Sequence, residues 1–429
     1  MSSFPGGFEM KMNEHRNISE NQTFCRILTG ESVAGAASVL EGEVFVVCDR
    51  AVRHLADDLV RESRRLAETG QGSAAIRAVL PIEASEAEKS MDTVLTICRW
   101  LLENGADRSS LLLAIGGGIT TDMAGFAASI YKRGIRFAFI PTTLLAQVDA
   151  AIGGKTGVNF LDLKNMLGVI RQPEWTWICL EPLRTLPLRD FRSGAAELLK
   201  TFLLENRNDH YARAVRLLTE LCGTGCPGRV AFAPAAEREL QELIAEAAAV
   251  KAGVVSRDAE EHGERRKLNL GHTFAHGIEW AARQLSREAG GGPGTESVNV
   301  THGEAVAIGI VLAARLAEKL GLTERPDDPG ADGGPASKGL AARLEADFAA
   351  CGLPTESPFP PDALEEAMTK DKKADGGSVR FILPVAVGKV VEKALAVSEA
   401  LALLGERTGT PSDGASQFLR DTGATDKEI

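Results

Sequence analysis

The run GGGITTDMAGFAASIYKRGIRFAFIPTTLLAQVDAAIGGK, residues 116–155, decides the fold of this chain of 429 residues. The pattern predicts an apolar strand at Leu111–Ile115, directly before the three glycines, and a helix at Met123–Lys132. A second buried strand is predicted at Phe137–Ile140. A strand, a glycine turn and a helix N-terminus together present backbone N–H groups and the positive end of a helix dipole to an anion. The run therefore predicts a phosphate-binding unit. A tight buried turn stays as the alternative, because the spacing is not GxGxxG.

Polar side chains are dense in and just after this run. A purely structural strand–helix–strand unit has no use for so many of them, so their presence favours ligand binding. They are Asp122, Arg133, Thr142, Asp149, Lys155, Asn159, Lys164 and Asn165.

The composition bounds the class of protein. A chain of this length with 44% hydrophobic residues is expected to form two domains. The net charge of −11 argues against nucleic acid as a partner, although local basic pockets stay possible. No apolar run approaches the ~20 residues that span a bilayer, and the first twenty residues lack a signal-peptide core, so we expect a cytoplasmic protein with no membrane partner. Seven cysteines fit reduced thiols, and the Cys222–Cys226 spacing is attributed to a helix end.

Strands alternate with helices in the first half of the chain, and helices fill the second half. This pattern predicts a mainly parallel sheet followed by a helical region, with the boundary near Pro187–Phe191. The expected strands of the first half are 24–28, 44–48 and 76–80, and its further helices are 52–67 and 87–103. The expected helices of the second half are 197–204, 235–255, 274–285, 303–320 and 340–350.

The predicted fold class is thus α/β plus all-α, with a Rossmann-like α/β domain before a helical domain. The segments 289–295 and 325–337 are predicted surface insertions. The expected boundaries are a flexible leader at 1–20, the α/β domain at 21–188, the helical domain at 189–404, and a disordered tail at 405–429.

Three of the seven histidines fall in two short motifs. His272 and His276 in NLGHTFAHGIE lie four residues apart and share one face of a helix, and His302 stands in THGEA. Glu197, in a largely apolar predicted helix, is a further candidate ligand, three residues before Lys200. Two imidazoles and a carboxylate with open positions suit zinc or cobalt acting as a Lewis acid. A packed polar pair or a solvated charged face is the structural alternative. Upstream of the histidines, Lys251, Arg265 and Asn269 are expected to add cations and an amide to the same site.

The segment Met368–Lys373 reads MTKDKK, and Arg380–Pro384 follows it. By itself such a run is a solvated charge cluster. It gains a function only if it covers a site that needs another phosphate ligand.

Taken in order, the motifs resemble those of the 3-dehydroquinate synthases, a family of sugar-phosphate cyclases. The resemblance covers roughly Val44 to Val390. It rests on GGGxxxDxxGF, RGIRF, PTTLLAQVD, GGKTGVN, KNxxG with QP, LRTLP with FRSGxAExxK, LNLGHTFxH, HGEAVAxG, and DKK with RFxLPxxxGK.

The resemblance implies that the Rossmann-like domain at 21–188 binds NAD and that the helical domain at 189–404 binds metal and substrate. It also implies a role for each matching residue. The metal ligands, for Zn²⁺ or Co²⁺, would be Glu197, His272 and His302. The NAD-binding residues would be Asp49, Glu86, Lys89, Gly116, Gly117, Gly118, Asp122, Thr142, Thr143, Asp149, Lys155, Lys164 and Thr185. The substrate contacts would be Arg133, Asp149, Lys155, Asn165, Lys200, Lys251, Arg265, Asn269, His276 and Lys372, together with the three metal ligands. Of these, Lys155, Lys200, Lys251, Arg265, Asn269 and His276 would serve catalysis. Spacing alone does not choose between Lys372 and Lys373.

The implied reaction converts 3-deoxy-D-arabino-heptulosonate 7-phosphate to 3-dehydroquinate and phosphate, in the shikimate pathway of aromatic amino acid biosynthesis. Bound NAD⁺ oxidises an alcohol transiently, phosphate leaves, the ketone is reduced again, and an intramolecular aldol reaction closes the ring. Arg133 would reach the substrate of a neighbouring subunit, which implies a homodimer.

Three departures from the family pattern bear on substrate choice. Thr121 stands where glycine is usual, Phe202 stands where tyrosine is frequent, and 289–295 lengthens the link between the histidine motifs. The alternatives are another cyclase of the valiolone or deoxyinosose type, a metal-dependent polyol dehydrogenase, and a non-catalytic binding relative. GGK at 153–155, Gln172-Pro173 and the intact DKK favour dehydroquinate synthase. A polyol dehydrogenase would not need so many cations.

Overall fold

The structure is a computed structural model that describes residues 25–161, 163–226, 228–288, 300–324, 339–370 and 378–405. The chain divides into two compact units, one of Met1–Pro187 with Arg229–Glu261 and one of Leu188–Gly228 with His262–Ile429. The first crossing, after Pro187, lies one residue before the expected domain boundary. The predicted leader, the tail beyond Gly405, and the segments 289–295 and 325–337 lie outside the described residues.

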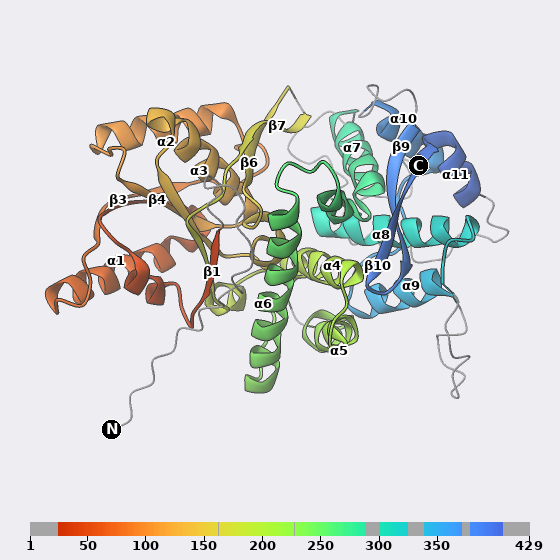
Figure 1. The fold of residues 1–429 in the computed structure, drawn as a ribbon, viewed down its shortest axis with the longest axis horizontal. Helices are drawn as coiled ribbons and strands as arrows, with labels where there is room; N and C mark the ends of the chain where they lie inside the picture. The colour runs from red at the N-terminus through yellow and green to blue at the C-terminus, as the bar shows by residue number, and fades with distance from the viewer. Residues whose placement is uncertain are drawn as a thin grey trace. The chain divides into compact units, whose positions relative to one another are not determined.

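A parallel six-stranded sheet forms the centre of the first unit (Figure 1). Its order is β1-β8-β5-β4-β2-β3, and each neighbouring pair is parallel. The strands are β1 (Arg26–Thr29), β2 (Glu43–Asp49), β3 (Ala75–Ile82), β4 (Leu111–Gly116), β5 (Arg136–Pro141) and β8 (Trp175–Ile178).

Helices cover both faces of this sheet, because its central strands are apolar on both sides. In β2, Phe45 and Val47 point to one face, where α2 (Met91–Glu103) and α3 (Gly118–Ile130) pack. Val44 and Val46 point to the opposite face, where α1 (Arg53–Glu68) packs. The helix after β2 and the helix after β4 therefore lie on opposite faces. This arrangement makes the gap between the two strands a topological switch point.

Two further elements complete the first unit. The antiparallel hairpin of β6 (Lys155–Phe160) and β7 (Leu163–Ile170) lies between β5 and β8 in sequence, and β6 packs on α3. Helix α6 (Pro234–Arg257) packs against the short π-helix η4 (Ala146–Ala150) and β1. The prediction had put 229–261 in the second domain, but these contacts place it in the first unit. The short 3-10 helices of this unit are η1 (Ala34–Val39), η2 (Arg50–Val52), η3 (Tyr131–Arg133) and η5 (Glu181–Arg184).

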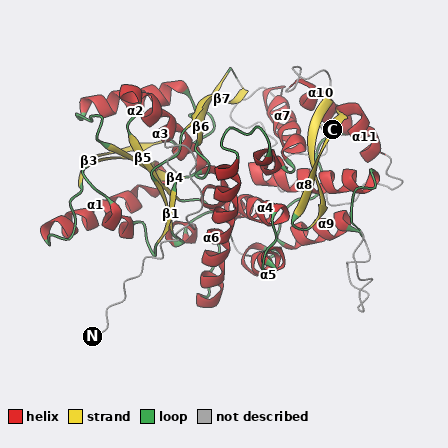
Figure 2. Cartoon of the chain, viewed as in Figure 1, coloured by secondary structure: helices red, strands yellow, loops and turns green. Residues whose placement is uncertain are grey.

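The second unit is mainly helical and is built around one buried helix, α8 (His302–Lys319) (Figure 2). The helix starts with a capping box, in which the Thr301 side chain accepts from the Glu304 backbone N–H and the Glu304 carboxylate accepts from the Thr301 N–H. Around it lie α4 (Leu188–Leu204), α5 (His210–Cys222), η6 (Glu264–Asn269), α7 (His272–Glu288), α9 (Leu340–Ala350), α10 (Pro361–Lys370), the hairpin of β9 (Ser378–Ala386) and β10 (Lys389–Ala396), and α11 (Val397–Gly405).

Several element ends differ from the prediction for identifiable reasons. Helix α3 begins at Gly118, five residues earlier than expected, because Gly117 is its N-cap and the third glycine is already helical. Helix α2 begins four residues late, since Ser90 caps it by accepting from the Thr93 N–H. Helix α4 runs from Leu188, well before the predicted start at Glu197. The hairpin β6–β7 was not predicted, because Gly157 and Gly168 interrupt its apolar pattern.

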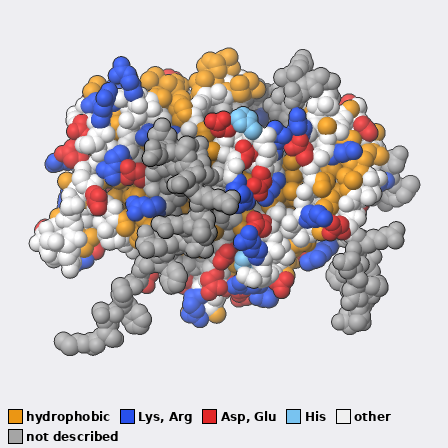
Figure 3. Space-filling model, viewed as in Figure 1, with side chains coloured by type: hydrophobic (Ala, Val, Ile, Leu, Met, Phe, Trp, Pro, Cys, Tyr) orange, Lys and Arg blue, Asp and Glu red, His pale blue; other side chains and the backbone are white. Residues whose placement is uncertain are grey.

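Two surface properties bear on the class of protein. Among the described helices, none combines the length and apolar character that a bilayer crossing requires. Acidic and basic side chains are mixed across the face drawn in Figure 3.

Candidate active site

The glycine turn joins the end of β4 to the start of α3. Gly117 is the N-cap residue, and no side chain among the described residues caps the helix, so its first N–H groups stay open to an anion. A Cβ atom on Gly116 would lie 2.4 Å from Thr120 Oγ1, and one on Gly118 would lie 2.9 Å from Ala150 Cβ. The glycines are thus also required by close packing within the protein. Both readings of the triplet, the buried turn and the anion cradle, fit its structure.

Asp49 lies at the end of β2, directly beside β4 in the sheet. Its carboxylate accepts a hydrogen bond of 2.9 Å from the Ala51 N–H. Burial raises its pKa, and the nearby Glu83 adds to the effect. An acidic group at this position of a switch-point crevice is placed to bind a ribose hydroxyl.

Lys89 connects two other predicted site residues, Asp122 and Asn165. Its Nζ donates to Asp122 Oδ2 and to Asn165 Oδ1, each at 2.6 Å. Asn159 in turn accepts from the Asn165 N–H and donates to Glu86 Oε1 at 2.9 Å. Burial raises the pKa of Asp122 to about 6, although the Lys89 ammonium opposes the shift. The network fixes the β6–β7 hairpin against the glycine-turn helix.

Asp149 and Lys251 form a second buried contact of the first unit. Lys251 Nζ donates to Asp149 Oδ1 at 2.6 Å and to the Asp149 carbonyl at 2.7 Å. Lys155 pairs with Glu261, and Lys164 lies 3.9 Å from Glu86.

The remaining predicted residues of the first unit differ in exposure. Thr142 is buried and donates its N–H to the Gly116 carbonyl, while the Thr143 hydroxyl accepts from the Ala146 N–H. Thr185 and Arg133 are exposed, and Arg133 has a positive φ of 69°.

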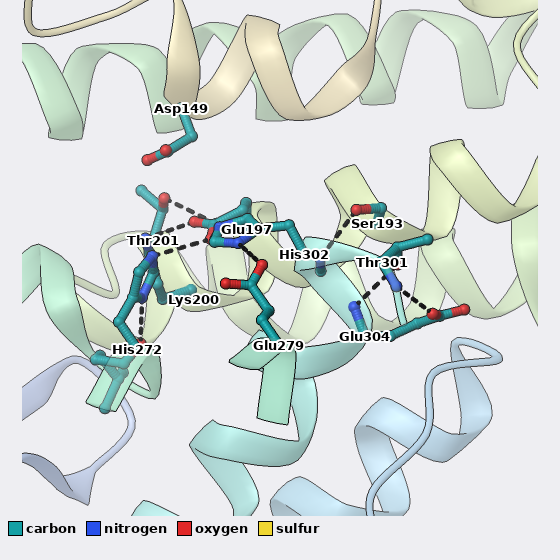
Figure 4. A network of polar contacts seen from close by, with 12 residues as sticks. Asp149, Ser193, Glu197, Lys200, Thr201, His272, Glu279, Thr301, His302 and Glu304 are labelled. Carbon is teal, nitrogen blue, oxygen red and sulfur yellow. Dashed lines mark hydrogen bonds and ion pairs between the residues drawn. The ribbon is translucent and has the colours of Figure 1, made fainter. Parts of the chain in front are cut away.

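In the second unit, three side chains from three helices meet. Glu197 of α4, His272 of α7 and His302 of α8 each offer one ligand atom, and these atoms lie within 4.8 Å of one another (Figure 4). Glu197 is fully buried, and its Oε1 lies 3.4 Å from His302 Nε2 and 3.7 Å from His272 Nε2. Lys200 Nζ is 2.5 Å from its other oxygen. Two imidazole nitrogens and a carboxylate at this spacing are a donor set for a divalent metal ion.

In both imidazole rings, Nδ1 contacts an oxygen atom on the side of the ring that faces away from Glu197. His272 Nδ1 lies 3.2 Å from the Leu270 carbonyl oxygen. His302 Nδ1 lies 3.1 Å from Glu279 Oε1, and Figure 4 shows these two side chains together. These contacts leave Nε2 of each ring directed at Glu197, the arrangement that a metal-binding histidine needs.

The pKa of each ionisable group in the cluster depends on the charges of its neighbours. Burial alone would raise the pKa of Glu197, but the Lys200 ammonium and the two histidines hold it well below its ordinary value. Burial, aided by the Lys200 charge, lowers the pKa of His272 to about 3, so this ring is neutral. Burial opposes charge on His302 as well, but Glu197 and Glu279 raise its pKa to about 10. A metal ion would replace the Nε2 proton of that ring.

The start of α8 is fixed on α4 by two contacts. Arg189 makes a two-point ion pair with Glu304, with both N–O distances 2.8 Å. Ser193 Oγ accepts from the Gly303 N–H at 3.0 Å, and a Cβ atom on Gly303 would lie only 2.1 Å from the Ser193 carbonyl oxygen. Because Glu197 lies one turn after Ser193, these contacts set the distance between Glu197 and His302.

The other predicted site residues of this unit differ in their exposure and in the element that carries them. His276 is exposed, and its ring centroid lies 5.7 Å from that of His272. Arg265 is buried in η6, which packs against α4, and Asn269 is the last residue of η6. Lys372 and Lys373 lie outside the described residues.

Sequence reasoning missed Glu279, Arg189, Ser193 and Glu304 as supporting residues. A signal existed for Glu279, which follows His272 by seven residues and so shares its helix face. No comparable spacing links Arg189 to Glu304.

Two family models match consecutive parts of the chain: the 3-dehydroquinate synthase N-terminal model matches residues 79–193, and the C-terminal model matches residues 194–374. The 3-dehydroquinate synthase of Agrobacterium fabrum is 38% identical over 76% of this chain and 79% of its own length. The chain belongs to the 3-dehydroquinate synthase family. A second family member, from Pyrococcus abyssi, is also 38% identical, over 76% of this chain and 85% of its own length.

A solved structure has a similar fold to this member of the 3-dehydroquinate synthase family. It is 2-epi-5-epi-valiolone synthase from Streptomyces hygroscopicus, with NAD⁺ and Zn²⁺ bound. The sequences are 26% identical, the TM-score is 0.70, and the match covers 92% of this chain and 98% of the other. The likeness supports the predicted fold class, a parallel α/β domain with a helical domain.

Proposed function

We propose that this protein is a 3-dehydroquinate synthase. It would convert 3-deoxy-D-arabino-heptulosonate 7-phosphate to 3-dehydroquinate and phosphate, a carbon–oxygen lyase reaction without net redox change. The observation that carries the proposal is the meeting of Glu197, His272 and His302 in a chain of this family. The proposal places the protein in the shikimate pathway.

NAD is the proposed redox cofactor. Its pyrophosphate would lie at the open N-terminus of α3, and Asp49 at the end of β2 would bind the adenosine ribose. The Lys89–Asp122–Asn165 network would hold the adjoining hairpin in place. When bound, NAD⁺ supplies a reversible hydride acceptor. The further proposed contacts are Glu86, Thr142, Thr143, Asp149, Lys155, Lys164 and Thr185.

Glu197, His272 and His302 fit a divalent metal ion. Glu197 is fully buried, yet neither of its oxygens has a well-directed hydrogen bond from a described residue. Two imidazole nitrogens and one carboxylate suit Zn²⁺ or Co²⁺ and leave coordination positions for substrate. Such an ion supplies Lewis acidity, which lowers the pKa of a coordinated hydroxyl group.

The protein's own cations would bind and orient a substrate that has two anionic groups. A phosphate and a carboxylate both favour charge-assisted hydrogen bonds, and several fixed contacts hold a flexible chain in one reactive conformation. His276 is exposed beside the cluster and would hold or move a proton, or donate to a developing oxyanion. The proposed substrate contacts are Arg133, Asp149, Lys155, Asn165, Lys200, Lys251, Arg265, Asn269, His276 and Lys372.

A homodimer is the proposed assembly. Strand β7 pairs only with β6 among the described strands, so one edge of this hairpin is open. Several large apolar side chains on and near it are exposed, including Leu161 at 77% and Met166 at 57%. A second copy of the chain would cover this surface through a self-complementary contact about a two-fold axis. We further propose a cytoplasmic location with no nucleic acid or membrane partner.

A panel of sugar phosphates tests the substrate. With NAD⁺ and Co²⁺ or Zn²⁺, the full chain should release phosphate from the heptulosonate phosphate. It should do so much faster than from sedoheptulose 7-phosphate, a valiolone-type substrate, or glucose 6-phosphate, an inosose-type substrate. Faster release from either rival would reassign the protein to another cyclase type. NADH accumulation with a polyol would instead identify a dehydrogenase.

A further inference from the structure

Glu279 lies on the side of His302 that faces away from Glu197. It belongs to α7, two turns after His272, and is 5% exposed. Its Oε1 lies 3.1 Å from His302 Nδ1, whereas His302 Nε2 lies 3.4 Å from Glu197 Oε1. The ring is therefore held between two buried carboxylates, one on each nitrogen (Figure 4).

The two histidines of the cluster are supported differently. The acceptor for His272 Nδ1 is a neutral backbone carbonyl, that of Leu270, which no side-chain substitution removes. The acceptor for His302 Nδ1 is a charged side chain from another helix. A carboxylate acceptor fixes the ring orientation and tautomer and makes the opposite nitrogen a stronger metal donor.

We propose that Glu279 is a positioning residue for the metal centre, which orients His302 and raises the affinity of the site for a divalent ion. The inference rests on the proposed metal site, because it assigns a role toward that ion. The contact also joins two of the helices that supply ligands. Helix α7 carries the ligand His272 and also Glu279, which supports the ligand His302 on α8.

Metal affinity measured without substrate tests this role. The full chain is stripped of metal and titrated with Co²⁺ against a chromophoric chelator. Glu279→Ala should weaken Co²⁺ binding by about 10- to 100-fold, the usual effect of losing such a support. Glu279→Gln retains an acceptor oxygen of similar reach, and should recover part of the loss. The intensity of the visible Co²⁺ absorption should change in Glu279→Ala, because the geometry of the bound ion changes.

Glu318→Gln provides the matched control. Glu318 lies on the same helix as His302 and its carboxylate also accepts an N–H, that of Ala341, but it contacts no proposed ligand. This variant should bind Co²⁺ as the parent protein does. If Glu279→Ala binds Co²⁺ within twofold of the parent affinity and with an unchanged absorption spectrum, the proposed role of Glu279 is wrong, and the proposed metal site is unaffected. A parent protein that binds no Co²⁺ would overturn the proposed metal site together with the role of Glu279.

Discussion

Asp122 combines burial with an ion pair, and the two act in opposite directions. Burial raises its pKa from 3.8 to about 6, so the folded protein holds this proton more tightly than the unfolded chain. The Asp122 contribution to stability is therefore fully present below about pH 4 and is lost as the pH rises to about 6. Above that pH the carboxylate is ionised and paired with Lys89.

Asp122→Asn isolates this titration. We expect the stability of the parent, relative to that of the variant, to fall between about pH 4 and 6 by up to about 3 kcal/mol, and to stay level above that range. Unfolding midpoints of both proteins across the pH range measure the difference. A difference that rises with pH over the same interval would show that Lys89 outweighs burial.

Asp49 carries the proposed choice between NAD and its 2′-phosphorylated form. Asp49→Asn keeps an acceptor for the Ala51 N–H but removes the charge that would repel a phosphate. We expect the ratio of NADH to NADPH affinity to fall about tenfold, measured by calorimetric titration of the full chain. Glu62→Gln, which removes a charge further along α1, should leave the ratio unchanged. An unaltered ratio in Asp49→Asn would place the ribose elsewhere.

At the scale of elements, the contact between α4 and α8 depends on Gly303. A methyl group there would lie 2.4 Å from the Ser193 Cα and would force the two helices apart. Gly303→Ala should lower stability by about 1–3 kcal/mol and weaken metal binding, because His302 moves away from Glu197. Thermal unfolding and a Co²⁺ titration check both effects.

Gly253→Ala in α6 is the corresponding control. The nearest atom to its added methyl group would be the flexible end of Arg257, at 3.3 Å. Because alanine favours a helix over glycine, this variant should be neutral or slightly stabilising. Equal stability of the two variants would mean that α8 does not depend on its close approach to α4.

The open edge of β7 gives a second prediction for an element. Met166→Asp places a charge in the exposed apolar surface of the hairpin and should weaken a homodimer by at least tenfold in Kd. Analytical ultracentrifugation of the full chain measures this shift. Leu285→Asp, at an exposed apolar position on α7, should leave the dimer intact. A Met166→Asp protein that dimerises like the parent would exclude this surface.

The sequence predicts the helices and strands whose apolar residues repeat with a clear period. It does not predict the features that depend on contacts between distant segments. Five of the six sheet strands and α9 follow from their apolar pattern, whereas β8 was not predicted. The three metal-ligand candidates were found from residue type, and the structure brings them together. The Arg189–Glu304 pair joins residues that share no local motif, so only the folded chain reveals it. Likewise, α6 looks like any helix of the second half, and its contact through Lys251 with Asp149 assigns it to the first unit.

At the scale of the whole molecule, each unit supplies a different part of the proposed chemistry. The first has a switch-point crevice suited to a dinucleotide, and the second has a buried donor set suited to a divalent ion. Neither part alone distinguishes a cyclase from a dehydrogenase. What distinguishes them is whether the hydride removed from the substrate returns to it.

Simultaneous measurement of phosphate, 3-dehydroquinate and NADH during turnover tests this claim most directly. The full chain with NAD⁺ and Co²⁺ should release one phosphate for each 3-dehydroquinate formed from the heptulosonate phosphate, with no accumulation of NADH. Steady NADH formation in step with substrate consumption, or phosphate release without 3-dehydroquinate, would contradict the account.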